Sequence, residues 1–189
     1  MAMDAGDRPV GGHVIWDSSP RAVARLREAV MPHAAVGVLR VVLQQLVLHE
    51  EGREAGRHEV IDEIVDVGGN LVASPMRESV RADPAASAAL DGALAQLRAD
   101  ISAELHATVD SLEVVLDRDG RHEARLLLSA EVSPRELAEG PAPEALHDGD
   151  HHIRHQSPAL EELRDRLAVP SGPLRRVLDG LRERLVRRA

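Results

Sequence analysis

The chain has almost no aromatic side chains, and this constrains how its core is filled. Trp16 is the only aromatic residue among 189, because Phe and Tyr do not occur. Aromatic side chains supply the largest burial areas in most cores, so Leu, Val and Ala must fill the space instead. Hydrophobic residues make up 43% of the chain, which suffices for a packed core and disfavours wholesale disorder. At this length we expect one compact domain with a short appendage.

The absence of cysteine excludes disulfides, thiolate metal sites and cysteine nucleophiles. The first seven residues are acidic and lack the apolar core of a signal peptide. The most apolar stretch, residues 34–48, is too short to span a bilayer and contains Arg40 and two glutamines. We therefore expect a cytoplasmic protein that makes no membrane contact.

The sequence motifs that assemble catalytic or nucleotide-binding sites are missing. Gly68-Gly69 stands without a phosphate-binding loop or a dinucleotide fingerprint around it, and no Gly-x-Ser-x-Gly elbow is present. Residues 58–63 begin like a metalloprotease helix, but Asp62 stands where that motif needs its second histidine. We expect a non-enzymatic protein that uses no cofactor.

The net charge of −9 is spread unevenly along the chain. Residues 151–189 hold nine Arg against five Asp and Glu, a local charge of +4, which leaves −13 for residues 1–150. An acidic body attracts a basic protein partner through complementary fields, and this is the interaction we expect. The densest run of carboxylates, expected to form the partner-binding surface, comprises Glu50, Glu51, Glu54, Glu59, Asp62, Glu63 and Asp66.

Capping residues mark the starts of two helices, which follow a flexible lead-in over residues 1–17. Ser19-Pro20 supplies a hydroxyl cap and a proline at the first helical position, for a helix that reaches about Met31. Asp83-Pro84 does the same for the clearest helix of the chain, which ends near His106. One apolar stripe runs along this second helix through Leu90, Leu94, Leu97, Ile101 and Leu105.

Between these helices the apolar pattern predicts three strands. Val and Leu run almost continuously over residues 36–48, which favours a strand buried on both faces, with a buried helix as the alternative. A turn over residues 51–56 leads to a second strand over 58–67. A short third strand over 71–73 follows a glycine break.

The strongest hairpin pattern follows the long helix. Residues 112–116 alternate apolar and polar, Asp119-Gly120 forms the turn, and residues 122–130 return. Ser133-Pro134-Arg135-Glu136 is a capping box that opens a short helix. We therefore expect an α+β body over residues 18–139, in which an antiparallel meander and a hairpin pack on a long amphipathic helix.

Beyond the body, the composition predicts a linker and then a C-terminal helical hairpin. Residues 140–156 are rich in Pro, Gly, Asp and His, which is typical of a linker. The hairpin would occupy residues 157–189, with helices over about 158–167 and 173–187.

A histidine-rich tract within the expected linker is the densest group of potential metal ligands. His147, His151 and His155 are weak candidates for zinc or nickel, and the last two would share a face if the tract were helical. The alternative is a solvated linker kept polar by its histidines and aspartates. We favour the second interpretation and expect no metal site.

The stretch from Leu160 to Leu181 resembles the helix-turn-helix of bacterial transcription regulators in its apolar spacing. This resemblance implies DNA binding through residues 157–189, with Arg175, Arg176 and Arg182 near bases or phosphates. The alternative is an amphipathic hairpin that covers the body. Arg164 favours this alternative, because it places a charged side chain where two helices of the motif must nearly touch.

The expected order of elements, together with the segment Ser111–Arg125 and its Asp-Gly turn, looks like the YezG-type immunity proteins. Those are small acidic bacterial proteins that neutralise a cognate toxin by binding it. The resemblance implies stoichiometric protein–protein binding without bond-making chemistry. The competing interpretation is a transcriptional regulator that binds DNA through its C-terminal segment.

Replacing Arg175 and Arg176 together by Ala separates these two functions. If the C-terminal hairpin is structural, the full-length protein does not retard duplex DNA at physiological ionic strength. The double variant then changes the free energy of unfolding by at most about 0.5 kcal/mol, as surface substitutions do. A mobility-shift assay measures the DNA retardation, and denaturant titration measures the free energy of unfolding. Salt-sensitive retardation that the double variant loses would establish the regulator instead.

Overall fold

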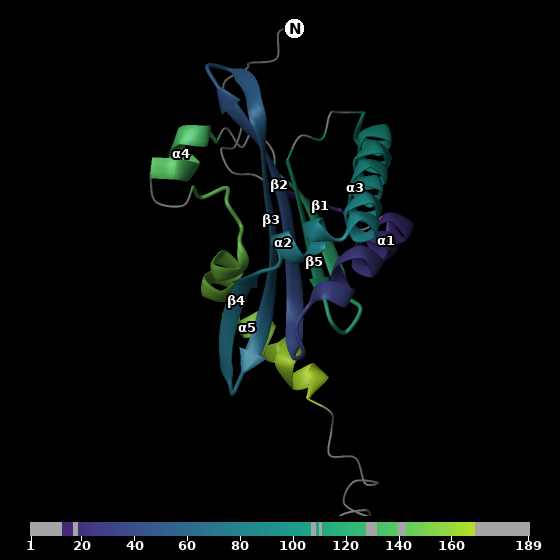
Figure 1. The fold of residues 1–189 in the computed structure, drawn as a ribbon, viewed down its shortest axis with the longest axis vertical. Coiled ribbons are helices and arrows are strands. Elements are labelled where there is room, and N and C mark those ends of the chain that lie inside the picture. The colour runs from purple at the N-terminus through teal and green to yellow at the C-terminus, as the bar shows by residue number, and fades with distance from the viewer. Residues whose placement is uncertain are drawn as a thin grey trace, which may run out of the picture.

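The computed structural model describes residues 13–16, 19–106, 109, 111–127, 132–139 and 143–168. These residues form a six-stranded antiparallel sheet with helices on both faces, which confirms the α+β class (Figure 1). The elements are β1 (His13–Trp16), α1 (Pro20–Val30), the 3₁₀ turn η1 (Met31–His33), β2 (Val38–Glu50), β3 (Arg53–Val67), β4 (Asn70–Pro75), α2 (Arg77–Ala82), α3 (Pro84–Leu105), β5 (Ser111–Asp117), β6 (His122–Leu127), α4 (Pro134–Glu139) and α5 (Gly149–Leu167).

The strands lie in the order β1-β6-β5-β2-β3-β4, so the Val- and Leu-rich β2 is central. It pairs with β3 along almost its whole length, but with β5 only from Arg40 to Gln45. β4 in turn pairs with β3 only from Asp62 to Val67. The β2–β3 hairpin is therefore longer than its neighbours and projects beyond them (Figure 1).

The main core lies between the sheet and the pair α1 and α3, and it is aliphatic as the composition requires. Leu26 of α1 and Leu97 of α3 are completely buried against Leu43 and Leu112 of the sheet. Trp16 is buried as well, and its indole Nε1 donates to Ser19 Oγ at 3.1 Å. Branched side chains thus fill the volume that aromatic residues occupy in other cores.

α1 and α3 start at their predicted positions, although only α3 has the expected side-chain cap. Asp83 accepts hydrogen bonds from the backbone N–H groups of Ala85 and Ala86, directly ahead of Pro84. Ser19 makes no cap, because its hydroxyl accepts from the indole of Trp16 instead. The stripe of α3 is buried as far as Ile101, whereas Leu105 in the last turn is 43% exposed.

The boundaries of three strands differ from the prediction. The turn expected over 51–56 contains only Glu51 and Gly52, both with positive φ, so β3 begins at Arg53 rather than at residue 58. The short third strand extends over 70–75, and part of the expected lead-in forms β1. Backbone pairing extends each strand beyond the apolar residues that revealed it.

The largest correction concerns the expected linker over residues 140–156. Its second half is helical, because α5 begins at Gly149, where Asp148 Oδ1 accepts from the backbone N–H of His151 at 2.7 Å. The predicted start at residue 158 coincides with a kink in α5, at Gln156 and Pro158. Residues 1–12 and the second predicted helix over 173–187 lie outside the described residues.

Two smaller predictions are confirmed. The Ser133–Glu136 capping box forms reciprocally, with the backbone N–H of Glu136 donating to Ser133 Oγ at 3.1 Å and that of Ser133 to Glu136 Oε2 at 2.7 Å. β5 and β6 form the predicted hairpin. Every residue of β5 is buried, however, so the expected alternation of apolar and polar residues does not leave this strand with an exposed side. Across the described part of the chain, no helix combines the length and apolar character needed to cross a membrane.

The aliphatic core predicts a large effect of shortening Leu97, which is completely buried in the middle of α3. Leu97→Ala removes buried methyl groups and leaves a cavity that the surrounding side chains fill only partly. We expect the free energy of unfolding to fall by about 2–5 kcal/mol in denaturant titration. Ala95→Ser, on the exposed face of the same helix, is the control and should change it little.

Candidate functional site: a buried histidine–carboxylate network

The sheet face opposite α1 and α3 is covered by residues 143–148 and by α5 (Figure 1). The apolar contact on this face is small: Val42, Ile64 and Leu160 form its buried cluster, with Leu71 and Ile153 packed at its margin. Polar side chains of the sheet occupy much of the remaining interface. They hold this layer in place and form the only dense group of buried titratable residues that we find in the described part of the chain.

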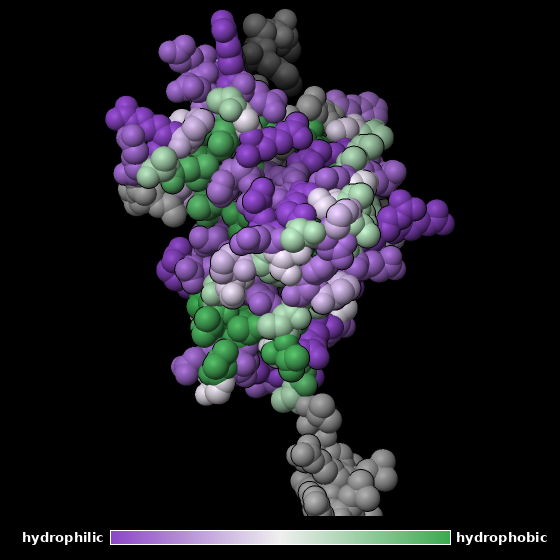
Figure 2. Space-filling model, in the orientation of Figure 1, coloured by the Kyte–Doolittle hydropathy of each residue, from purple (hydrophilic) through white to green (hydrophobic). Residues whose placement is uncertain are grey.

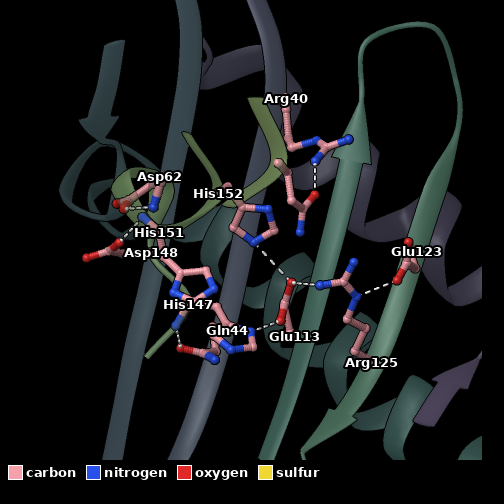
Figure 3. A network of polar contacts seen from close by, with 12 residues as sticks. Arg40, Gln44, Asp62, Glu113, Glu123, Arg125, His147, Asp148, His151 and His152 are labelled. Atoms are coloured by element: carbon pink, nitrogen blue, oxygen red, sulfur yellow. Dashed lines mark hydrogen bonds and ion pairs between the residues drawn. The ribbon is translucent and has the colours of Figure 1, made fainter. Parts of the chain in front are cut away.

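Glu113 lies at the centre of this network, on β5, and is completely buried (Figure 3). His147 Nδ1 contacts its Oε2, while His152 Nε2 lies 3.0 Å and Arg125 Nη1 3.5 Å from its Oε1. Burial opposes ionisation of the carboxyl group, but the contacts with the two histidines outweigh it. They hold the pKa of Glu113 well below its usual value, so this carboxylate is charged at neutral pH.

Two further sheet residues bind the backbone of the covering segment. The Gln44 side-chain amide donates from Nε2 to the carbonyl of Ala145 at 2.9 Å and accepts from the backbone N–H of His147 at 3.0 Å. Asp62 Oδ2 accepts from the backbone N–H of Gly149 at 2.9 Å. Burial, reinforced by nearby carboxylates, raises the pKa of Asp62 above its usual value although this hydrogen bond opposes the change. Together these contacts fix where α5 begins.

Gly149 is required at this point because α5 starts in contact with the sheet. A Cβ atom on Gly149 would lie 2.7 Å from the Cβ of Ala73 and 3.2 Å from that of Asp62. Any other residue would push the first turn of α5 away from β3 and β4. The glycine that suggested a linker in the sequence therefore serves close packing.

A second buried pair attaches the kink of α5. Arg40 on β2 donates from Nε to Asp117 Oδ1 at 2.7 Å, and from Nη2 to Oδ2 at 3.3 Å. The Nη1 of the same guanidinium donates to Gln156 Oε1 at 2.6 Å, at the residue where α5 bends. The kink thus lies over a fixed charge on the sheet.

The histidines of the network form a stack along α5. The ring centroids of His147 and His151 are 4.3 Å apart, and those of His151 and His155 are 4.4 Å apart. Partial burial lowers the pKa of His151, and the neighbouring histidines lower it further, to about 4. His152 is completely buried, and its Nδ1 has no hydrogen-bond partner among the residues that the structure describes.

The three weak metal candidates are among these stacked rings. In the region that the structure describes, no group of three or more His, Asp or Glu side chains is arranged to hold a metal ion. The rings of His147, His151 and His155 lie face to face, and the nearest buried carboxylate, Glu113, is already in contact with His147, His152 and Arg125.

The seven carboxylates expected to form one partner-binding surface lie in different places. Only Glu50, Glu51 and Glu54 are exposed, at the tip of the β2–β3 hairpin. The other four contact groups of their own chain: Glu59 pairs with Arg77 and Arg81, Asp62 binds Gly149, Glu63 accepts from the backbone N–H of Ala35, and Asp66 accepts from that of Gly69. Alternation along β3 turns Glu59 and Glu63 to the α3 face and Asp62 to the α5 face.

Sequence reasoning missed Glu113, the centre of the site. Its position in the alternating strand was visible, but the pattern marked it as a solvent-facing residue because nothing showed that a second layer covers this face. The DNA-binding candidates Arg175, Arg176 and Arg182 lie outside the described residues, so DNA binding stays a prediction.

The two innermost members of this network are closed off from solvent. Glu113 and His152 have no exposed surface, and the layer of residues 143–156 separates them from solvent. Their contacts are made with one another and with the sheet, which is what a structural attachment requires. No protein-family model matches the chain, and no curated protein matches it significantly in sequence.

The network predicts that acid weakens the α5 layer. The pKa of His151 is about 4 in the folded protein against 6.5 for a free side chain, so its contribution to stability is complete above about pH 6.5 and declines as the pH falls towards 4. The lowered pKa of Glu113 acts in the same direction below about pH 4.5. Hydrogen exchange between pH 7 and 4, corrected for its intrinsic rate, should show α5 losing protection before α3.

The control is His151→Gln, which removes the titrating ring and keeps a polar side chain. Its α5 layer should lose less protection than that of the unaltered protein between pH 6.5 and 4.5, while the loss below pH 4.5 remains. Equal losses in both proteins over the upper range would contradict the role given to His151.

Proposed function

We propose that this chain is a non-enzymatic protein that binds a protein partner in a fixed ratio, through its β2–β3 hairpin. The observation that carries this proposal is the outer edge of β3. Among the residues that the structure describes, no strand pairs with that edge between Arg53 and Val60, because β4 begins its pairing only at Asp62. The backbone groups along such an edge can pair with an extended segment of another protein.

The tip of the hairpin supplies a charge that selects the partner. Glu50, Glu51 and Glu54 are exposed there, and the end of the hairpin is hydrophilic (Figure 2). Glu54 pairs with Arg57 at 3.4 Å, but both side chains are more than half exposed, so this pair is weak. Exposed carboxylates attract a basic partner and raise its association rate. The charge of −13 over residues 1–150 extends this attraction over longer distances.

The same edge carries features that limit pairing with copies of itself. Gly56 has a φ of 140°, and the register with β2 shifts between Leu48 and His49. Irregularities and charged side chains of this kind are common on strand edges that must not aggregate. The edge therefore suits a partner of complementary shape and charge better than a second copy.

A partner of this kind agrees with the resemblance to YezG-type immunity proteins, which implies neutralisation of a toxin by binding. It also agrees with the burial of Glu113 and His152, the residues best suited to acid–base chemistry, which contact their own chain. We therefore favour binding over catalysis as the activity of the protein.

Neutralising the hairpin tip tests this function. The variant Glu50→Gln, Glu51→Gln, Glu54→Gln removes three exposed charges without disturbing the backbone. A protein captured from native lysate by the unaltered chain is purified, and its stoichiometry and association rate are measured by calorimetry and surface binding. We expect a one-to-one complex whose association is slowed by salt, and slowed about tenfold by the triple variant at low salt.

The matched control is Glu78→Gln, Glu104→Gln, Glu161→Gln, which changes the net charge equally at three exposed positions away from the hairpin. It should associate nearly as fast as the unaltered chain. Equal slowing by the two triple variants would show that overall charge alone attracts the partner, and the hairpin would then not be the binding site.

A further inference from the structure

A groove of about 490 Å³ lies between α1 and α3, on the side of the molecule away from α5. Its lining is mostly small and apolar, with Ala29 on α1 and with Ala89 and Gly92 on α3. The charged residues of the lining are Glu28, Asp83 and Arg25, and His33 lies among them. Small side chains allow the backbone of another helix to come close, so the groove is shaped for a helix with an apolar face.

We propose that residues 173–187 of the same chain occupy this groove as a helix. The sequence predicts a helix over this range, and five of its six Leu and Val residues fall on one stripe, Val186 being the exception. The stripe consists of Leu174, Val177, Leu178, Leu181 and Leu185. From Leu174 to Leu185 the stripe measures about 16 Å along a helix. The groove extends about 12 Å along α3, from Ala85 to Ala93. The two lengths are compatible.

The end of α5 lies close enough for this segment to reach the groove. Arg166 in the last turn of α5 binds Asp119 Oδ2 at 3.0 Å, in the turn between β5 and β6. Arg27 on α1 donates to the carbonyl of Arg121 at 2.9 Å, in the same turn. The last turns of α5 and α1 therefore each bind the same β5–β6 turn through an arginine side chain, although the two helices cover opposite faces of the sheet.

The chain between Ala168 and Pro173 connects α5 to the proposed helix. Its five Cα–Cα steps span up to about 18 Å when extended. The connecting sequence Val169-Pro170-Ser171-Gly172 contains residues that favour a change of direction. The segment can therefore leave the α5 face and enter the groove beside α1.

Charge favours the same placement. Residues 169–189 contain six Arg against one Asp and one Glu, a net charge of +4. Arg175 and Arg182 are seven residues apart and so lie on one flank of the stripe. The groove lining offers two carboxylates, Glu28 and Asp83, against the single guanidinium of Arg25. In this arrangement the leucine stripe is covered and the arginines stay at the margin.

The absence of native cysteine gives a direct test in the full-length protein. The pair Ala89→Cys with Leu178→Cys places one thiol in the groove and one on the stripe. In dilute solution we expect its intramolecular disulfide to form about tenfold faster than in either control pair, at a rate independent of protein concentration. Mass spectrometry of unreduced digests identifies the bond.

Two control pairs make the result specific to the groove. Ala89→Cys with Glu183→Cys places the second thiol on the opposite side of the expected helix, and Ala103→Cys with Leu178→Cys moves the first along α3 beyond the groove. Equal rates for all three pairs would overturn the proposal, since the segment would then have no fixed face on the groove. A disulfide formed only between molecules, faster at higher concentration, would assign the groove to a second copy and would also overturn it.

A second measurement avoids cysteines. Leu178→Gln with Leu181→Gln should increase hydrogen exchange of the groove-facing turns of α1 and α3 while α5 is unchanged. Arg176→Gln with Arg187→Gln, on the other side of the predicted helix, should leave all three helices unchanged. No difference between the two double variants would contradict docking of the leucine stripe.

Discussion

The layer formed by residues 143–148 and α5 depends on the contacts that its histidines make with the buried carboxylate of Glu113. A charge without exposed surface is tolerated only when hydrogen-bond donors and cations surround it, and His147, His152 and Arg125 do so. Two of these three come from the segment that covers the sheet, so the charge can remain buried only while that segment is in place. The need to satisfy this acidic side chain therefore adds to the contacts of Gln44, Asp62 and Arg40 in fixing the position of residues 143–156.

The two faces of the sheet are consequently stabilised by different forces. On the α1 and α3 face, a continuous aliphatic core stabilises the fold by burial of apolar surface. This contribution does not depend on pH or on the exact orientation of the side chains. On the α5 face, Gln44, Asp62 and Glu113 make directional contacts over a small apolar cluster. Directional contacts define a single placement of α5, and those made by the Glu113 carboxylate weaken when this group is protonated.

The sequence predicted what depends on local apolar pattern and missed what depends on contacts distant along the chain. The stripe of α3 and the Asp83 cap were predictable, because each lies within a few residues of its partners. Glu113 was not, because its histidine partners lie more than thirty residues later, in a stretch that its composition marked as a linker. Gly149 was likewise interpreted as part of a linker, because its close approach to Ala73 exists only after the sheet forms.

The unequal length of the strands connects the fold to binding. β2 and β3 lie between two helical layers, because α3 covers one face of the sheet and α5 the other. Their hairpin extends beyond the residues that pair with β5 and β4. An edge left open in this way can bind promiscuously unless charge and irregularity restrict it, and Glu54 and Gly56 provide both. The interior, by contrast, places its carboxylates against their own chain. Of the carboxylates predicted to bind a partner, those at the hairpin tip are therefore the ones that are exposed to a partner.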